Sequence, residues 1–298
     1  MMKKIISMSV LLIILLLANP LFMSEKEEVL IAPPEQVSVL DTSEMVTVTE
    51  KKWKEKYPEV YESIKEALKQ FQPVMVYNTK EIDQEELDQM LSHIIDNHRT
   101  NTYLKEWEYW ELALRDEGEV HFTYSLPRDE IIAQEQFIKE EVARLADELV
   151  TSQMSEGEIV RAFHDYIVLH TAYDEHAAET CGESDCYDPA YSAYGLLKNG
   201  DAVCEGYAQV LTLLLDAVGI ENYYVQGDAG DELHAWNLVK VDGHYYYIDT
   251  TWDDPAPDEE GVVYDDYFLV SADELDDHHW KRDDYPKSAA HRYEEVAR

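Results

Sequence analysis

The chain has 298 residues, of which 63 are acidic and 24 are basic, so its formal net charge is −39 at pH 7. A nucleic-acid partner needs basic patches that replace its counterions, and this composition excludes that function. The carboxylates lack the alternating spacing of a calcium loop, and we interpret them as a hydrated surface suited to salty or alkaline surroundings.

The first 24 residues have the layout of a secretory signal. Two lysines precede an unbroken run of apolar or small residues at 5–18, and an acidic stretch begins at Glu25. A membrane-spanning helix needs roughly 20 apolar residues, and the run reaches that length only when 21–23 are counted across a proline. We predict a signal peptide or an N-terminal anchor at 1–24. The protein would then be secreted or lie on the extracellular cell surface, with membrane contact only if this segment is uncleaved.

The region before residue 151 is predicted to hold a linker and a small α/β extension. Residues 25–50 contain Pro-Pro with isolated Val and Thr and no sustained period, which is typical of a linker. Residues 51–150 alternate between helical spacing and strand-like runs, which indicates an N-terminal α/β extension. The expected elements are a helix at 52–72, a strand at 73–79, a helix at 83–98, a strand at 119–126 and a helix at 129–150.

The three cysteines of an exported chain predict one disulfide and one free thiol. Cys181 and Cys186 form the natural pair because they lie in CGESDC, a short glycine-containing loop. Two free thiols are the alternative. A metal site that includes His176 is weaker, because it lacks a second pair of ligands. We predict no metal site, and the sequence has no nucleotide, haem or flavin motif, so we predict no cofactor.

Cys204 is expected to begin a buried helix. Apolar side chains recur at spacings of three and four residues from Cys204 to Val218, and Gly219 ends the pattern. A thiol in the first turn lies near the partial positive charge of the helix N-terminus, which predicts a thiol pKa below the usual value of about 8.5. The N–H of Cys204 would have no partner inside the helix and could bind an oxyanion. The alternative is a small core residue, the usual role of a lone cysteine on an apolar helix face.

A hairpin after this helix is expected to bring His234 and Asp249 together. HAWNLVKV and HYYYID flank an Asp-Gly dipeptide at 242–243, which is a strong signal for a two-residue turn. This register makes His234 and Asp249 diagonal neighbours on one face, close enough for the carboxylate to accept a hydrogen bond from the imidazole. A one-residue slip would separate them. The expected pairs are Val241 with His244, Lys240 with Tyr245, and Leu238 with Tyr247.

Cys204, His234 and Asp249 together predict a thiol active site. His234 would hold the thiolate as an ion pair and exchange a proton with the second substrate, and Asp249 would fix the tautomer of His234 and stabilise its imidazolium form. Each residue alone has a structural explanation: a helix-packing thiol, a polar strand-edge histidine and a turn-opening aspartate. Their order and shared geometry favour the triad.

Three segments, GDAVCEGYAQVL, ELHAWNLVKVDGHYYYIDTTWDDP and YDDYFLVS, resemble the transglutaminase-like superfamily, in particular its bacterial secreted or cell-surface members. The resemblance covers about 155–275. It implies a papain-like α+β fold in which a helix carrying the cysteine packs on an antiparallel sheet carrying the histidine and aspartate. The family's catalytic residues correspond to Cys204, His234 and Asp249. We therefore predict a transglutaminase-like catalytic domain at 151–298.

Members of this superfamily attack a carboxamide or peptide carbonyl, form a thioester and release it to an amine or to water. The resemblance therefore implies a peptide or protein substrate, including substrates associated with the cell wall. Asn199 and Tyr194 are candidates for a second oxyanion donor. The aromatic residues Tyr207, Trp236 and Trp252 are candidates for a substrate groove, with buried packing as the alternative. The calcium loops of animal transglutaminases have no counterpart here.

Two other functions stay open at this point. A cysteine protease or amidase would use the same fold and the same three residues, because the triad does not choose between amine and water as acceptor. A non-catalytic module would bind peptide or cell-wall polymer in the former groove. The intact triad counts against such a module, since binding alone needs neither a free thiol nor an aligned histidine and aspartate.

Overall fold

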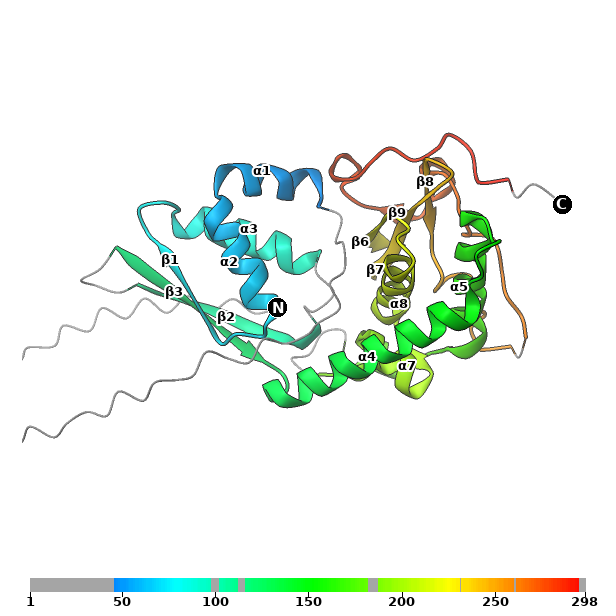
Figure 1. The fold of residues 1–298 in the computed structure, drawn as a ribbon, viewed down its shortest axis with the longest axis horizontal. Helices are drawn as coiled ribbons and strands as arrows, with labels where there is room; N and C mark the ends of the chain where they lie inside the picture. Colours follow the sequence, from blue (N-terminus) through cyan, green and yellow to red (C-terminus); the bar gives the residue numbers. More distant parts are fainter. Residues whose placement is uncertain are drawn as a thin grey trace, which may run out of the picture.

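A computed structural model describes residues 46–97, 102–111, 116–181, 187–230, 232–259 and 261–294. The predicted signal peptide or anchor and most of the predicted linker lie outside these ranges. Cys186 also lies outside them, so the predicted disulfide is not among the described features. Within the described part of the chain, no helix combines the length and apolarity that crossing a bilayer requires. The elements form two groups, an N-terminal one around β1–β3 and a C-terminal one around α8 and β6–β9 (Figure 1).

The N-terminal group packs helices on an antiparallel sheet of order β1-β3-β2. Its core includes Ile64, Leu87, Leu91 and Val120, all fully buried. The elements are α1 (Val48–Lys56), α2 (Pro58–Lys69), β1 (Val74–Asn78), α3 (Gln84–Asp96), β2 (Leu104–Glu111) and β3 (Glu117–Tyr124).

The single helix predicted at 52–72 is in fact two helices, and the first begins earlier. Thr47 caps α1 in a capping box with Glu50, so the helix starts inside the stretch predicted as linker. Tyr57 ends α1 and Pro58 begins α2. Proline has no N–H to donate and clashes with the preceding turn, but it fits the first position of a new helix. Strand β2 is a further element that the sequence pattern did not predict.

The C-terminal group has α8 packed on the antiparallel sheet β8-β7-β6-β9, with α4, α5 and α7 around it. Helix α4 contributes Ile138 and Val142 to this core, although its residues fall in the predicted extension. The domain division stays a prediction. The larger elements are α4 (Arg128–Leu149), α5 (Glu156–His170), α7 (Ala193–Asn199), α8 (Cys204–Ala217), β6 (Asn222–Ala229), β7 (Glu232–Val241), β8 (His244–Ile248) and β9 (His278–His279). The smaller ones are β4 (Ala172–Tyr173), α6 (Glu175–Cys181), β5 (Asp201–Ala202) and 3₁₀ helices at Pro189–Tyr191, Ala272–Glu274 and Arg282–Asp284.

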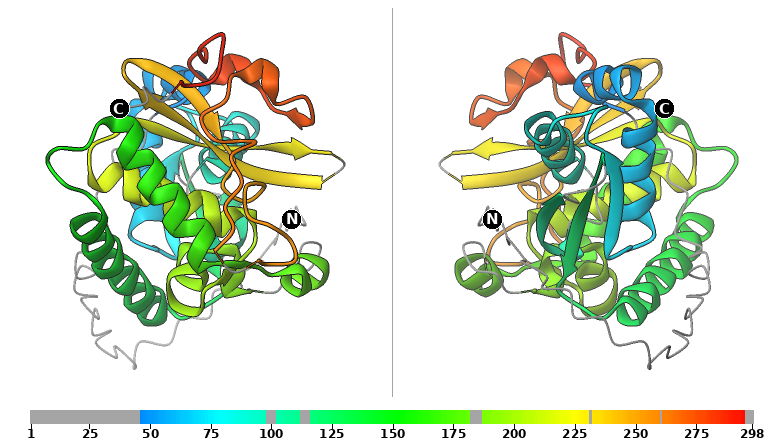
Figure 2. Two further views of the ribbon diagram at one scale, coloured as in Figure 1. Left: turned by 90° about the vertical axis from the view of Figure 1, so that its right-hand side faces the viewer. Right: turned by 90° about the vertical axis from the view of Figure 1, so that its left-hand side faces the viewer.

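The predicted hairpin register is confirmed. Asp242 and Gly243 both have positive φ (50° and 80°), as a two-residue turn of this kind requires. The two strands β6 and β7, yellow in Figure 2, form a second long hairpin that extends beyond the helices. The strand pairs are Val241 with His244, Lys240 with Tyr245, and Leu238 with Tyr247.

The predicted fold class is also confirmed. Cys204 is the first residue of α8, and α8 packs on β6 and β7. His234 lies on β7, and Asp249 directly follows the last residue of β8. The chain therefore has an α+β core in which a cysteine-bearing helix covers the antiparallel sheet that positions the histidine and aspartate.

Candidate active site

Cys204 is held at the buried start of α8. Its side chain is only 6% exposed and packs with Ala208, Tyr224 and Ala235. The first turn of α8 lies close to a neighbouring loop because Gly206 has no side chain: a Cβ there would lie 2.9 Å from the carbonyl oxygen of Ala190. Burial and close backbone packing therefore fix the position of the sulfur.

The sulfur has one polar and one packing contact on neighbouring elements. The thiol of Cys204 donates to Oε2 of Glu205 at 3.1 Å, and Ala235 packs against the Cys204 side chain. Ala235 follows His234 on β7, so this packing places the start of α8 against the strand that carries the histidine. Helix and sheet are thus joined at the place where the predicted nucleophile and base lie.

The predicted lowering of the thiol pKa is wrong for this arrangement. Burial, followed by the charge and hydrogen bond of Glu205, raises the pKa of the Cys204 thiol well above its ordinary value. The Ala235 N–H acts in the opposite direction and is outweighed. The partial charge of a helix N-terminus is a smaller effect than removing a thiolate from water. The thiol is therefore neutral in the resting structure.

Replacing Glu205 by glutamine is expected to make the thiol more reactive at neutral pH. The change removes a negative charge next to the sulfur, so the thiol pKa falls and more thiolate forms at a given pH. The rate of iodoacetamide modification of Cys204, located by mass spectrometry, should rise at lower pH in Glu205→Gln than in the wild type. An unchanged profile would mean that burial alone sets the pKa.

His234 and Asp249 form the hydrogen bond that the hairpin register predicts. Nε2 of His234 lies 2.7 Å from Oδ2 of Asp249, and the carboxylate is 1% exposed. The other oxygen, Oδ1, accepts from the backbone N–H groups of Thr251 and Trp252. Nε2 of His234 is thereby engaged, which leaves Nδ1 as the ring nitrogen for exchange with a thiol.

The charges of this pair reinforce each other. Burial raises the pKa of Asp249, but the charge and hydrogen bonds of His234 and the contact with His278 lower it more, so it lies well below its usual range. Burial lowers the pKa of His234, and the charge and hydrogen bond of Asp249 outweigh that effect, so the net direction is upward. An imidazolium at His234 is therefore stabilised by the buried Asp249 carboxylate.

Only one of the three predicted groove residues keeps exposed surface next to the site. Tyr207 and Trp236 are 0% and 1% exposed, and the Tyr207 hydroxyl donates to Asp254 in the interior. Both were wrong as groove residues, because Tyr207 is buried in the core around α8 and Trp236 is buried on the other face of β7, with Leu238 and Tyr247. Trp252 is half-buried, with its ring 5.5 Å from the ring of His234. Trp252 stays a candidate for contact with substrate.

The two predicted oxyanion side chains make their contacts elsewhere. Asn199 is the last residue of α7, and its side chain lies close to Asp201. Tyr194 packs edge-on against Phe137 of α4, with ring centroids 5.4 Å apart. Among the described contacts neither side chain reaches Cys204. The backbone N–H of Cys204, in the first turn of α8, remains the candidate oxyanion donor.

Two residues of the site were missed by the sequence reasoning. Glu205 directly follows Cys204 in the sequence. Its contact with the sulfur, however, depends on the rotamer of the Glu205 side chain, which the sequence does not give. His278 donates toward Asp249 from 29 residues further along the chain, with Nε2 2.9 Å from Oδ2. It comes from a two-residue strand in an irregular segment, where no periodic pattern marks it.

We tested whether a metal ion could bind next to the site. One ligand atom from each of His234, Asp249 and His278 lies within 4.8 Å of the others. The nitrogen-to-Oδ2 distances are 2.7 and 2.9 Å. Ligand atoms around a tetrahedral zinc ion lie roughly 3.3 Å apart, as follows from zinc–nitrogen bonds of about 2.0 Å. The observed distances are those of hydrogen bonds, so we interpret the three as a hydrogen-bonded network and identify no metal ligands among them.

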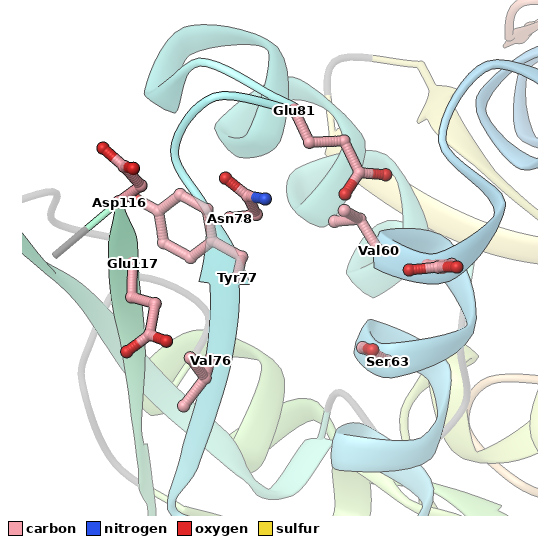
Figure 3. Close-up of a pocket in the computed structure, with 9 residues that line it drawn as sticks. Val60, Ser63, Val76, Tyr77, Asn78, Glu81, Asp116 and Glu117 are labelled. Atoms are coloured by element: carbon pink, nitrogen blue, oxygen red, sulfur yellow. The ribbon is translucent and has the colours of Figure 1, made fainter.

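A cavity of about 680 Å³ lies elsewhere, in the N-terminal group. It is lined by α2, the end of β1 and the start of β3, and includes Glu81 and Glu117 (Figure 3). No predicted catalytic, oxyanion or groove residue lines it. Its carboxylates match the acidic surface expected from the composition, and we assign it no role in the chemistry.

A thiol at a helix N-terminus, against an antiparallel sheet that positions a histidine and an aspartate, defines the papain-like class of α+β proteins. Residues 143–250 match the model of the Transglutaminase-like superfamily, and this segment of the chain belongs to that superfamily. The matched segment contains Cys204, His234 and Asp249.

The chain is similar to two known relatives. The kyphoscoliosis peptidase of Mus musculus is 25% identical over 150 residues, which cover 45% of this chain and 22% of the relative. The kyphoscoliosis peptidase of Homo sapiens is 30% identical over 122 residues, covering 36% and 18%. The chain thus spans about a fifth of the length of these relatives. The crystal structure of a TGase aligns with a TM-score of 0.34 and 19% identity, over 57% of this chain and 48% of that chain.

Proposed function

We propose that the protein is a thiol enzyme that transfers an acyl group from a peptide or carboxamide through a thioester. Cys204 is the nucleophile, His234 is the general acid and base, and Asp249 orients His234. One observation carries this proposal: His234 is held on Asp249 at 2.7 Å, and Ala235, the next residue of the same strand, packs against Cys204.

The first half-reaction forms the thioester. The thiol proton passes to Nδ1 of His234 as the sulfur bonds to the carbonyl carbon, and the N–H of Cys204 stabilises the oxyanion. The carbon–nitrogen bond then breaks, and His234 returns the proton to the departing nitrogen, which leaves as ammonia or an amine. Because burial and Glu205 favour the neutral thiol, the proton transfer to His234 accompanies formation of the carbon–sulfur bond.

The second half-reaction consumes the thioester. An incoming amine gives a proton to His234 and attacks the carbonyl carbon, and the carbon–sulfur bond breaks. The proton on His234 then returns to the sulfur, so the enzyme is regenerated. Cys204 and His234 are 6% and 9% exposed, and this burial limits the access of water and of an amine alike, so it does not choose between the two acceptors.

A peptidase is the second candidate. Water replaces the amine in the second half-reaction, and the remaining steps are unchanged. The two relatives named as peptidases favour this alternative. Both candidates take a protein or peptide substrate. The signal-like layout of residues 1–24 supports a substrate at or outside the cell surface, such as a cell-wall peptide.

A pair of assays separates these candidates. The protein is incubated with a glutamine-containing peptide, with and without a fluorescent primary amine, and ammonia release, amine incorporation and peptide cleavage are measured. In parallel, iodoacetamide modification is followed from pH 5 to 9. We expect modification of Cys204 that accelerates toward alkaline pH, with ammonia release and amine incorporation. Cleavage without incorporation would replace transfer by hydrolysis, and the absence of every product together with an unreactive Cys204 would overturn an enzymatic role.

A further inference from the structure

We propose that His278 is a positioning residue for this reaction, which holds Asp249 in place and shares its carboxylate with His234. The inference rests on the proposed function. Oδ2 of Asp249 is bound by two imidazoles at once, by Nε2 of His234 at 2.7 Å and by Nε2 of His278 at 2.9 Å. The carboxylate of Asp249 therefore accepts hydrogen bonds from two imidazole rings.

The fold brings His278 to this place through an edge strand. Strand β9 pairs with the end of β6, with His278 opposite Ala229 and His279 opposite Asp228. This approach depends on Gly227, where a Cβ would lie 2.3 Å from the carbonyl oxygen of His279. The glycine lets β9 come close enough for His278 to point inward, while His279 faces solvent.

Aromatic neighbours fix the ring of His278. Its centroid lies 4.5 Å from the ring of Trp252, 4.9 Å from that of Trp236 and 5.7 Å from that of Tyr267. The side chain is fully buried. In the described part of the chain, Nδ1 has no hydrogen-bond partner, so Asp249 is the polar contact of this ring. The hydrogen bond to Asp249 is therefore the contact through which His278 acts on the site.

The shared oxygen affects both the position and the charge of the site. If His278 did not donate, Oδ2 would keep His234 as its only described donor, and Asp249 would be held by that bond and by the two backbone N–H groups at Oδ1. The full charge of Oδ2 would then act on His234 and hold its proton more tightly. The other charged groups that act on His234 are Glu205 on α8 and Glu232 on β7. Among the described hydrogen bonds neither reaches Oδ2, where His278 is the second donor beside His234.

Two substitutions test the proposal. His278→Phe keeps a ring in the aromatic cage but removes the donor, whereas His278→Gln keeps a donor that can reach Oδ2. His279→Phe, on the same strand but facing solvent, is the matched control. For each variant we would measure kcat and KM against pH, and titrate the His234 ring by NMR.

We expect His278→Phe to lower kcat by roughly ten- to hundredfold, the scale of loss when a catalytic group is misplaced, with KM little changed. The alkaline limb of its rate profile and the NMR midpoint of His234 should both move to higher pH. His278→Gln and His279→Phe should stay near the wild type. A wild-type midpoint for His234 in His278→Phe would overturn the inference. The NMR titration needs no activity, so a wild type without turnover would count against the proposed function alone.

Discussion

Replacing Cys204 by alanine is expected to abolish turnover while leaving the fold intact. Loss of the nucleophile of a serine protease lowers kcat by roughly a millionfold, and a loss of the same order is expected for the proposed thiol nucleophile. The side chain occupies a small cluster with Ala208, Tyr224 and Ala235, so alanine removes one sulfur atom and its hydrogen bond to Glu205. The expected loss of stability is about 1 kcal/mol, typical of a single substitution. Amine incorporation, peptide cleavage and thermal unfolding are measured together.

Cys204→Ser is the control for this prediction. It keeps a donor near Glu205 but offers a much poorer nucleophile, so it should fold like the wild type and remain inactive. If the alanine variant failed to fold, Cys204 would be mainly a core residue. If either variant kept full activity, the nucleophile would have to be another group.

Asp249→Asn is expected to cost nearly as much activity. The asparagine keeps the shape of the side chain and can still accept from the N–H groups of Thr251 and Trp252. Its amide nitrogen, however, donates hydrogen bonds and cannot accept one from an imidazole. His234 is therefore forced into the wrong tautomer, and its imidazolium form loses the carboxylate charge that stabilises it. A comparable change in a serine protease lowers kcat by roughly 10⁴-fold. Steady-state kinetics at fixed pH measures this loss, and a fall of less than about tenfold would remove Asp249 from the mechanism.

Asp249→Ala separates stability from catalysis. Alanine would leave four buried donors unpaired, two imidazole and two backbone N–H groups. Removing one partner of a buried pair costs about 3–5 kcal/mol, so this variant should unfold at lower denaturant concentration than Asp249→Asn. The observation that would contradict this is equal stability of the two variants.

The depressed pKa of Asp249 adds a pH signature. A carboxyl whose pKa is lower in the folded state contributes stability that is present above its unfolded pKa and is lost as pH falls through the folded value. The wild type should therefore lose stability on acidification below about pH 4, the ordinary aspartate pKa. Asp249→Asn lacks this titrating group, so its free energy of unfolding should depend less steeply on pH in the same window.

Local patterns in the sequence predicted much of the fold and the His234–Asp249 pair. The Asp-Gly turn fixes the register of two strands, and the register alone decides that His234 and Asp249 share a face. The helix beginning at Cys204 follows from the three-and-four spacing of apolar residues. These features depend on residues that are neighbours in the chain, which is why they could be predicted.

Features that depend on distant packing were missed or wrong. Burial of the Cys204 thiol reverses its expected pKa shift, and no local pattern reports how deeply a helix end is covered. Strand β6 was missed although it is central in the sheet, because its pattern lacks clear alternation. His278 was missed because only the pairing of β9 with β6 brings it to Asp249.

The neutral, covered thiol has a consequence for how long the protein survives in an oxidising compartment. Peroxide and disulfides react with the thiolate of an accessible cysteine, and the sulfinic and sulfonic acids that follow cannot be reduced back by ordinary thiols. Cys204 is 6% exposed and its thiol donates a hydrogen bond to Glu205, so little thiolate would meet such oxidants. The same contact that delays ionisation until a substrate arrives would therefore protect the sulfur from irreversible damage.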